Sequence, residues 1–385
     1  MRVGLICPAD FTVLLCCKWI IKHLQKKGKD VIVISPLSDD HFYLDEIKKF
    51  KIKHISIKMN RHINLLDDVI YIFELLRILK KYKIDSIFSV CTKPNIYSPL
   101  AGKFAGIQNI YTSVWGRGTV FLESRKLKDI TLKLILLFLY KLSFSISKIV
   151  WFTNPNDLNY FVSRKIVSKK KCLLSYNYID SDIYKPNIIT KERLNELRNE
   201  FDLDANDIVI ILVGRMIWSK GIKEFVEAGK ILSKEITNIK LLLVGAEEKN
   251  NPDSVPADYL NNLRNLKFIK WTKFRKDVPG LYSLAKIAVL PSYYKEGGYP
   301  RAITEPMSIG IPVIAADTPD CKGPIKDMHN GILVAPKNAQ DLANKIKILI
   351  QDEHLYYKLS KESRKTILNK FDEKKVVKEI IDKLF

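Results

Sequence analysis

Two glutamates flank a pair of glycines shortly after an apolar segment, and these residue types could bind a sugar. Glu296 precedes Gly297 and Gly298, Tyr299 follows them, and Glu305 lies further along. Because glycine has no side chain, such a turn lets backbone amides approach a ligand closely. The carboxylates can accept hydrogen bonds from sugar hydroxyls. Since glycine after a strand is also common without any ligand, the turn needs support from other segments.

Two cations follow the apolar segment 207–213. Gly214 and Arg215 come first, and Lys220 lies directly before Gly221. An arginine can hold a diphosphate with a bidentate fork, and a lysine adds a point charge. A helix that begins at Gly221 would add the positive end of its dipole. The alternative is a pair of solvated cations on a surface loop.

A third segment carries an aromatic side chain that could pack on a nucleotide base. Trp271 follows the apolar segment 266–269, although ordinary packing would explain this residue equally well. Glu305 falls in a predicted helix, where it could hold ribose hydroxyls or stabilise the first turn without a ligand. Ligands of open α/β sheets bind at the carboxyl ends of the strands. Because all three segments follow predicted strands, we expect them to meet in one cleft.

Short apolar segments alternate with amphipathic ones along the whole chain, which predicts two parallel, doubly wound α/β sheets. We expect strands at 2–7, 30–35, 53–57, 85–90, 108–112, 148–153, 207–213, 239–244, 266–269, 286–290 and 312–316. We expect helices at 12–27, 65–82, 94–105, 128–145, 155–164, 221–234, 257–264, 277–284, 302–309 and 338–351, and a helical tail from 354.

The fold class is therefore α/β, with two Rossmann-like domains that face a cleft. We predict an N-terminal domain over 1–186, a C-terminal domain over 187–365, and a helix over 366–385 that packs back on the N-terminal domain. The polar segment 177–200 is interpreted as the linker.

The chain of 385 residues is strongly basic, with 64 Lys and Arg against 42 Asp and Glu. A net charge of +22 favours nucleic acid, anionic lipid or phosphorylated substrates as partners. The lysines are spread along the chain, and we find no base-stacking or groove-reading module, so we expect no nucleic acid. The six cysteines lack disulfide spacing and indicate free thiols in a reducing compartment. Neither a signal peptide nor a membrane-spanning segment is predicted.

A short acidic motif, Asp180-Ser181-Asp182, resembles an Asp-x-Asp motif that binds a metal ion in other proteins, but it lies in the predicted linker. Chance occurrences in a chain of this length are common, and the histidines show no ligand spacing. We therefore expect no metal site and no cofactor.

The chain resembles the retaining GT-B glycosyltransferases of family 4, and within them bacterial enzymes that extend sugars linked to undecaprenyl diphosphate. The resemblance covers nearly the whole chain. It is carried by five strings: Arg215 to Phe225, Pro291 to Arg301, Thr318 to Cys321, Asn330-Gly331 and Leu139 to Phe144.

The resemblance implies a role for each candidate in the C-terminal domain. Arg215 and Lys220 would bind the donor diphosphate and stabilise the leaving nucleotide, and with Glu296 they would form the catalytic set. Donor binding would also involve Gly214, Trp271, Gly297, Gly298, Tyr299 and Glu305. Glu296 and the amides after it would lie by the sugar, and Glu305 would bind ribose. The donor would be a UDP-sugar, with retained configuration and no metal.

Three departures from the family pattern stand out. Eight residues separate Glu296 from Glu305 where the family has seven, so Gly298 looks like an insertion. The first loop, Cys7 to Asp10, lacks the usual glycines. The segment 115–119 has no histidine, which fits the lipid-linked subgroup and leaves no evident general base. A front-face retaining mechanism needs none.

The segment 122–146 combines several leucines and Phe138 with four cations: Arg125, Lys126, Lys128 and Lys133. It could be an amphipathic helix in a membrane interface or a buried crossover helix. The family resemblance favours the membrane. Lys93, Arg117 and Arg125 would then meet an acceptor diphosphate. The acceptor site would comprise residues that follow two predicted strands: Lys93, Asn95, Gly116, Arg117 and Gly118.

These expectations combine into a peripheral enzyme on the cytoplasmic face of the inner membrane. It would be a hexosyltransferase that moves an N-acetylhexosamine, GalNAc or GlcNAc, from UDP to an undecaprenyl-diphosphate-linked saccharide. The alternatives are a capsule or lipopolysaccharide glycosyltransferase with another hexose donor, a catalytically silent nucleotide-binding protein and, on charge alone, a nucleic-acid-binding protein.

Overall fold

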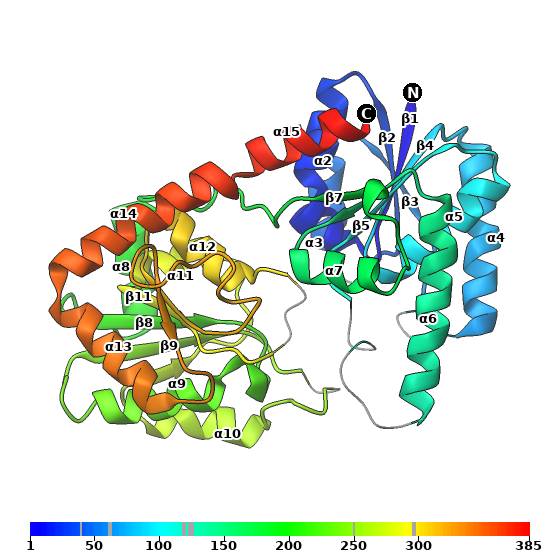
Figure 1. Ribbon diagram of the computed structural model, residues 1–385. Coiled ribbons are helices and arrows are strands. Elements are labelled where there is room, and N and C mark those ends of the chain that lie inside the picture. Colours follow the sequence, from blue (N-terminus) through cyan, green and yellow to red (C-terminus); the bar gives the residue numbers. More distant parts are fainter. Residues whose placement is uncertain (39–40, 61–63, 118–120, 122–126, 249–250, 295–297) are drawn as a thin grey trace. The chain divides into compact units, whose positions relative to one another are not determined.

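The computed structural model describes residues 1–38, 41–60, 64–117, 121, 127–248, 251–294 and 298–385 (Figure 1). Contacts within the chain divide it into two compact units. The first unit comprises Met1–Asn177 and Glu373–Phe385, and the second comprises Tyr178–Asp372. Each unit contains its own parallel sheet and its own hydrophobic core.

The first unit contains a seven-stranded sheet in the order β3-β2-β1-β4-β5-β6-β7. Every pair is parallel. Strands β1 and β4 are buried along most of their length because helices cover both faces of the sheet. The strands are β1 (Arg2–Ile6), β2 (Asp30–Ser35), β3 (Lys53–Ser56), β4 (Ser86–Val90), β5 (Asn109–Val114), β6 (Ile149–Phe152) and β7 (Cys172–Leu174).

Helices connect these strands, and α5 packs between its neighbours α4 and α6. The helix α15 also belongs to this unit: it packs on α2, Lys27 pairs with Asp382 at 2.8 Å, and Phe385 contacts Tyr111 edge-on. The helices are α1 (Asp10–Thr12), a π-helical turn (Val13–Cys17), α2 (Lys18–Lys26), α3 (His41–Lys48), α4 (Leu65–Lys81), α5 (Thr92–Phe104), α6 (Leu127–Ile146), α7 (Pro155–Ser163), a 3₁₀ turn (Lys169–Lys171) and α15 (Glu373–Leu384).

The second unit contains a six-stranded parallel sheet in the order β10-β9-β8-β11-β12-β13. Its strands are β8 (Ile208–Val213), β9 (Ile239–Val244), β10 (Ile269–Trp271), β11 (Ile287–Leu290), β12 (Val313–Ala316) and β13 (Ile332–Val334). Its helices are α8 (Lys191–Glu200), α9 (Ile222–Leu232), α10 (Ala257–Asn262), α11 (Val278–Leu284), α12 (Arg301–Ile309), α13 (Ala339–Gln351) and α14 (Glu353–Lys370), with 3₁₀ turns at Trp218–Lys220 and Leu263–Asn265.

The predicted α/β class with two Rossmann-like sheets is confirmed, and several local predictions are wrong. The segment predicted as a linker contains α8, whose mostly polar sequence gave no apolar periodicity. Thr190 caps this helix by accepting a hydrogen bond from the Arg193 amide, and Leu197 is fully buried. The short strands β7 and β13 were not predicted. Strand β10 lies at Ile269–Trp271, later than the predicted 266–269.

We expect Leu197→Ala to lower the free energy of unfolding by about 2–4 kcal/mol, because it leaves a cavity where α8 packs on α11. Asn195→Ala on the exposed side of the same helix is the matched control and should change stability by less than about 0.5 kcal/mol. Thermal and urea unfolding measure both. Equal effects for the two variants would contradict the packing of α8.

Candidate functional site

The loops that follow β8 and β9 touch at the carboxyl edge of the second sheet. Gly245 has a φ of +152°, and a Cβ atom there would lie 1.7 Å from the carbonyl oxygen of Gly214. Beyond this contact Met216 bridges to Glu247, and Ile217 bridges to Ser254. Only glycine permits so close an approach of two backbones. The contact therefore fixes the backbone of Arg215 at the carboxyl end of β8.

Lys220 ends a 3₁₀ turn and is almost fully buried. The next residue, Gly221, has a φ of +81°, and a Cβ atom there would lie 2.5 Å from the carbonyl oxygen of Pro291. The 11-residue helix α9 starts directly afterwards, so the first turn of backbone amides lies beside the lysine. Asp253 supports the turn by accepting hydrogen bonds from the amide and hydroxyl of Ser219.

The carbonyl oxygen of Ser219 connects this turn to the segment after β11. It accepts hydrogen bonds from the amides of Tyr293 at 2.9 Å and Tyr294 at 3.0 Å, and from the Ser292 hydroxyl at 3.2 Å. These bonds place the ring of Tyr294 next to both cations: Arg215 Cζ lies 5.2 Å and Lys220 Nζ lies 5.5 Å from its centroid. Cations at such distances are attracted to the ring.

Arg215 also forms an ion pair with Glu248, at 3.0 Å from Nη1 to Oε2, and its side chain remains partly exposed. Burial disfavours its charge, but Tyr294 and Glu248 outweigh that effect and raise the pKa of the guanidinium above its usual value. The arginine therefore stays charged and is held in place while part of its fork faces solvent. Sequence reasoning missed Glu248 and Asp253, because nothing in the sequence connects these distant carboxylates to the loop. The position of Tyr293 and Tyr294 just before the paired glycines in the sequence was the signal that could have indicated Tyr294.

Glu305 lies in the second turn of α12 and is largely buried. Arg301, one turn earlier, pairs with it at 2.9 Å from Nε to Oε1. Burial, and after it the Glu305 carboxylate, raise the pKa of the nearby Tyr184 hydroxyl. The buried side chain of Glu305 thus has a cationic partner in its own helix. Glu296 and Gly297 lie outside the described residues.

The side chain of Tyr299 is buried in the second unit. Its ring packs edge-on against Phe371 with centroids 6.0 Å apart. A Cβ atom on Gly323 would lie 1.8 Å from that ring, so the ring fills the space beside this glycine. Gly298 is buried as well. Any contribution of Gly298 and Tyr299 to binding would come from their backbone amides.

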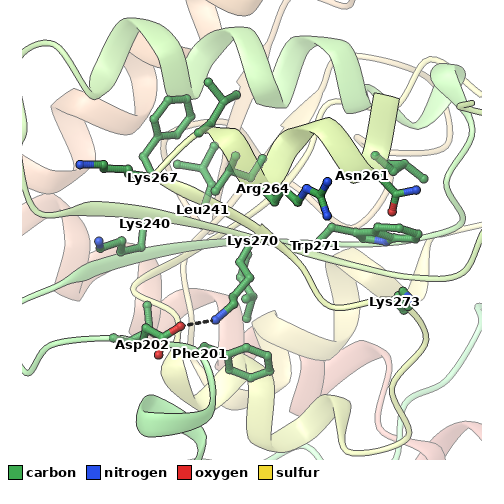
Figure 2. A pocket seen from close by; sticks show the side chains of 16 residues that line it. Phe201, Asp202, Lys240, Leu241, Asn261, Arg264, Lys267, Lys270, Trp271 and Lys273 are labelled. Atoms are coloured by element: carbon green, nitrogen blue, oxygen red, sulfur yellow. Dashed lines mark hydrogen bonds and ion pairs between the residues drawn. The ribbon is translucent and has the colours of Figure 1, made fainter. Parts of the chain in front are cut away.

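Trp271 ends β10 at the edge of the sheet and is partly buried. Its indole Nε1 donates a hydrogen bond to the carbonyl oxygen of Gly245 at 2.9 Å, which ties the edge strand to the loop contact described above. It also lines a cavity of about 400 Å³ (Figure 2). This cavity is rich in cations, and Asp202 pairs with one of them, Lys270, at 2.6 Å. Its other cationic residues are Lys240, Arg264, Lys267 and Lys273.

The candidate acceptor residues of the first unit have partners inside the protein. Lys93 is buried and pairs with Asp68 at 2.5 Å. Asn95 is fully buried and donates a hydrogen bond to the Ser113 carbonyl at 2.7 Å, which links α5 to β5. Arg117 pairs with Asp157 at 2.6 Å and lies 4.4 Å from the ring centroid of Tyr160.

Of these acceptor candidates, Arg117 keeps about a quarter of its side chain exposed. Gly116 precedes it, with a φ of +125°. Gly118 and Arg125 lie outside the described residues. A ligand could therefore reach Arg117 more readily than Lys93 or Asn95.

The Asp180-Ser181-Asp182 motif stabilises a turn in the structure. The Asp180 carboxylate accepts hydrogen bonds from the amides of Asp182 and Ile183, and the Ser181 hydroxyl donates to Asp372. Across the described ranges, no three His, Cys, Asp or Glu side chains are grouped so that they could hold a metal ion. The motif thus has a structural explanation.

The chain matches two family models that together cover most of its length. Residues 3–154 match "Glycosyl transferase 4-like", and residues 195–366 match "Glycosyl transferases group 1". The chain is 28% identical to the N,N'-diacetylbacillosaminyl-diphospho-undecaprenol alpha-1,3-N-acetylgalactosaminyltransferase of Campylobacter jejuni, over 97% of this chain and 95% of that protein. It is 26% identical to the UDP-Gal:alpha-D-GlcNAc-diphosphoundecaprenol alpha-1,3-galactosyltransferase of Escherichia coli, over 90% and 85%.

Solved structures show the same fold. Anabaena HepE in complex with UDP superposes with a TM-score of 0.79 at 18% identity, over 100% of this chain and 99% of that one. The lipopolysaccharide glycosyltransferase WaaG superposes with a TM-score of 0.74 at 15% identity, over 99% of both chains. The two family models identify the protein as a glycosyltransferase, and the solved structures show that it has the GT-B fold. It belongs to the group 1, family-4-like glycosyltransferases, as the sequence motifs indicated.

We expect Gly221→Ala to destabilise the protein more than Gly28→Ala. Both glycines have positive φ, so each alanine costs about 1–2 kcal/mol of backbone strain. Gly28 has open space around it, whereas the added methyl at Gly221 meets the Pro291 carbonyl. Thermal unfolding of the two variants separates the cost of backbone strain from the cost of the steric clash with Pro291. An equal loss in both would contradict the close contact at Pro291.

Proposed function

We propose that this glycosyltransferase moves an N-acetylhexosamine, GalNAc or GlcNAc, from a UDP donor to a saccharide linked to undecaprenyl diphosphate. The reaction retains the anomeric configuration and needs no metal ion. The observation that carries this proposal is the convergence of Arg215 and Lys220 on Tyr294 beside the start of α9. Two fixed cations and a helix N-terminus form a site for a diphosphate.

In this mechanism, Arg215 and Lys220 bind the donor diphosphate. The bond between the anomeric carbon and the β-phosphate oxygen breaks, and negative charge develops on the departing UDP. Cations already in place stabilise that charge more in the transition state than in the ground state. The acceptor hydroxyl attacks the same face and gives its proton to the departing phosphate oxygen. Glu296 and the amides of Gly297, Gly298 and Tyr299 lie by the donor sugar, while Glu305 binds ribose and Trp271 lies near the base.

The relatives support the acceptor class and the donor nucleotide. The names of the Campylobacter jejuni and Escherichia coli enzymes both specify acceptors linked to diphosphoundecaprenol. HepE was crystallised with UDP and with UDP-glucose. A second candidate is capsule synthesis with another hexose, because the chain is also 25% identical to CapM of Staphylococcus aureus over 94% of its length.

The first unit supplies the acceptor side of this proposal. Arg117 follows β5, together with Gly116 and Gly118, and would meet the acceptor diphosphate. Lys93 and Asn95 lie on α5 after β4 and would support the same carboxyl edge of the sheet. In the described segments, no helix is long and apolar enough to cross a bilayer. We propose that the protein is a peripheral enzyme on the cytoplasmic face of the inner membrane, held there through α6.

Arg215→Ala and Lys220→Ala should each lower kcat/KM by roughly 10²–10³, the loss typical when one group that stabilises transition-state charge is removed. Lys223→Ala is the matched control, because this lysine is exposed in the first turn of α9, three residues after Lys220. It should keep activity within about twofold. Release of UDP from candidate donors in the presence of a lipid-linked acceptor measures the rates. Full activity in both site variants would refute the donor assignment.

Thermal stability should rise with UDP and with one UDP-sugar, and EDTA should leave the increase unchanged. A ligand present at 100 times its Kd adds about 2.7 kcal/mol of stability. The measurement compares UDP, UDP-GlcNAc, UDP-GalNAc, UDP-glucose and GDP-mannose. An increase that EDTA abolishes would contradict metal independence. No increase with any nucleotide, combined with salt-sensitive retention on DNA, would favour nucleic-acid binding instead.

A further inference from the structure

The buried carboxylate of Glu305 has a second partner from a distant part of the sequence. The Glu305 side chain keeps 9% of its surface exposed, and Arg301 pairs with it at 2.9 Å. The hydroxyl of Tyr184 donates a hydrogen bond to Glu305 and accepts one from Arg301. Tyr184 is itself buried, with 8% of its surface exposed. Each of the three side chains therefore contacts the other two.

Tyr184 belongs to the segment through which the chain enters the second unit at Tyr178. The amide of Tyr184 donates to the carbonyl oxygen of Asp180 at 2.9 Å, which closes a turn in this segment. The amide of Ile179 donates to the carbonyl oxygen of Phe371 at 2.8 Å, and Phe371 directly follows α14. The backbone that leads to Tyr184 is therefore held both by its own turn and by the end of α14.

The backbone of Tyr184 is also bonded to the helix that carries Glu305. The carbonyl oxygen of Tyr184 accepts a hydrogen bond from the Ser308 hydroxyl at 2.6 Å. Ser308 lies one turn after Glu305 on α12, and its own carbonyl oxygen accepts a hydrogen bond from Arg364 of α14. Tyr184 thus contacts α12 through both its main chain and its hydroxyl, so the ring is fixed relative to the carboxylate.

Of the two partners of Glu305, Tyr184 is the one that can fix the direction of the carboxylate. Arg301 lies on the same helix and keeps 40% of its side chain exposed, so its long side chain can move together with Glu305. Tyr184 is buried and has only two side-chain torsions, so little conformational entropy opposes its hydrogen bond. Burial, and after it the Glu305 carboxylate, raise the pKa of the Tyr184 hydroxyl, which therefore remains a proton donor.

We propose that Tyr184 is a positioning residue for the donor ribose: its hydroxyl holds Glu305 in the orientation that accepts hydrogen bonds from the ribose hydroxyls. This inference rests on the proposed function, in which Glu305 binds ribose. A carboxylate offers about four acceptor positions, so the hydrogen bonds from Arg301 and Tyr184 leave capacity for a ribose. A binding group must be held within about 0.5 Å of its productive position by such supporting contacts. Without the Tyr184 hydroxyl, the carboxylate can turn away from the ribose.

Tyr282 of α11 provides a matched control beside the same carboxylate. It is fully buried, and after burial the charge of Glu305 contributes most to raising the pKa of its hydroxyl. Within the part of the chain that the structure describes, this hydroxyl has no hydrogen-bond partner. Tyr282→Phe should therefore leave Glu305 in place and cost little stability, because it breaks no hydrogen bond.

The test compares the affinity of the full chain for UDP and for 2′,3′-dideoxy-UDP, which lacks both ribose hydroxyls, by titration calorimetry. The wild type should prefer UDP by about tenfold or more, the contribution of a hydrogen bond to a charged group. Tyr184→Phe should reduce this preference to about threefold or less by raising the Kd of UDP. The Kd of dideoxy-UDP should change by less than about twofold, which shows that the variant is folded. Tyr282→Phe should keep the full preference.

The variant Glu305→Gln separates the possible outcomes, because it removes the charge itself. Adding Tyr184→Phe to it should cause no further loss of preference, since both changes act through one carboxylate. A reduced preference in Glu305→Gln beside an unchanged one in Tyr184→Phe would overturn the positioning role alone. An equal loss of affinity for both nucleotides in Tyr184→Phe would do the same. A wild type that binds neither nucleotide would reject the proposed function, and the positioning role with it.

Discussion

The carbonyl oxygen of Ser219 is the contact on which the site in the second unit depends. Three donors from the segment after β11 converge on this one acceptor, and so they join the loop of Arg215 and Lys220 to the segment that precedes Gly297 and Gly298 in the sequence. The bonds require Gly221 to turn with a positive φ against Pro291, and they bring Tyr294 to both cations. The electrostatics of the site therefore follow from backbone geometry, which positions charges before any ligand arrives.

The sequence was most informative where chemistry and periodicity coincide. Arg215 and Lys220 could be predicted at the carboxyl end of a strand because an apolar segment precedes them and a helix follows. The segment that contains them then matched known glycosyltransferases. The partners of these cations were not predictable, since Glu248 and Asp253 come from a loop after another strand. Helix α8 was missed because it buries few residues, with Leu197 as its one fully buried side chain.

Two cations of the first unit form ion pairs with carboxylates inside the protein. Lys93 and Arg117 would be counted as free cations from the sequence, yet each has a carboxylate partner on another helix. These pairs cross-link α5 to α4 and the β5 loop to α7. Buried pairs of this kind are costly to break because the remaining charge stays behind without its partner. They consequently hold the edge that follows β4 and β5 in one arrangement.

The division of the chain has a consequence for its synthesis. The first unit is interrupted: it comprises Met1–Asn177 but lacks α15 until Glu373–Phe385 has been made, and the whole second unit lies between. Buried side chains on α15, among them Val377, Ile380 and Ile381, belong to that missing piece. At typical elongation rates of about 5–20 residues per second, the ribosome leaves the surface of α2 uncovered for roughly 10–40 seconds. The unit that is translated first is thus completed last.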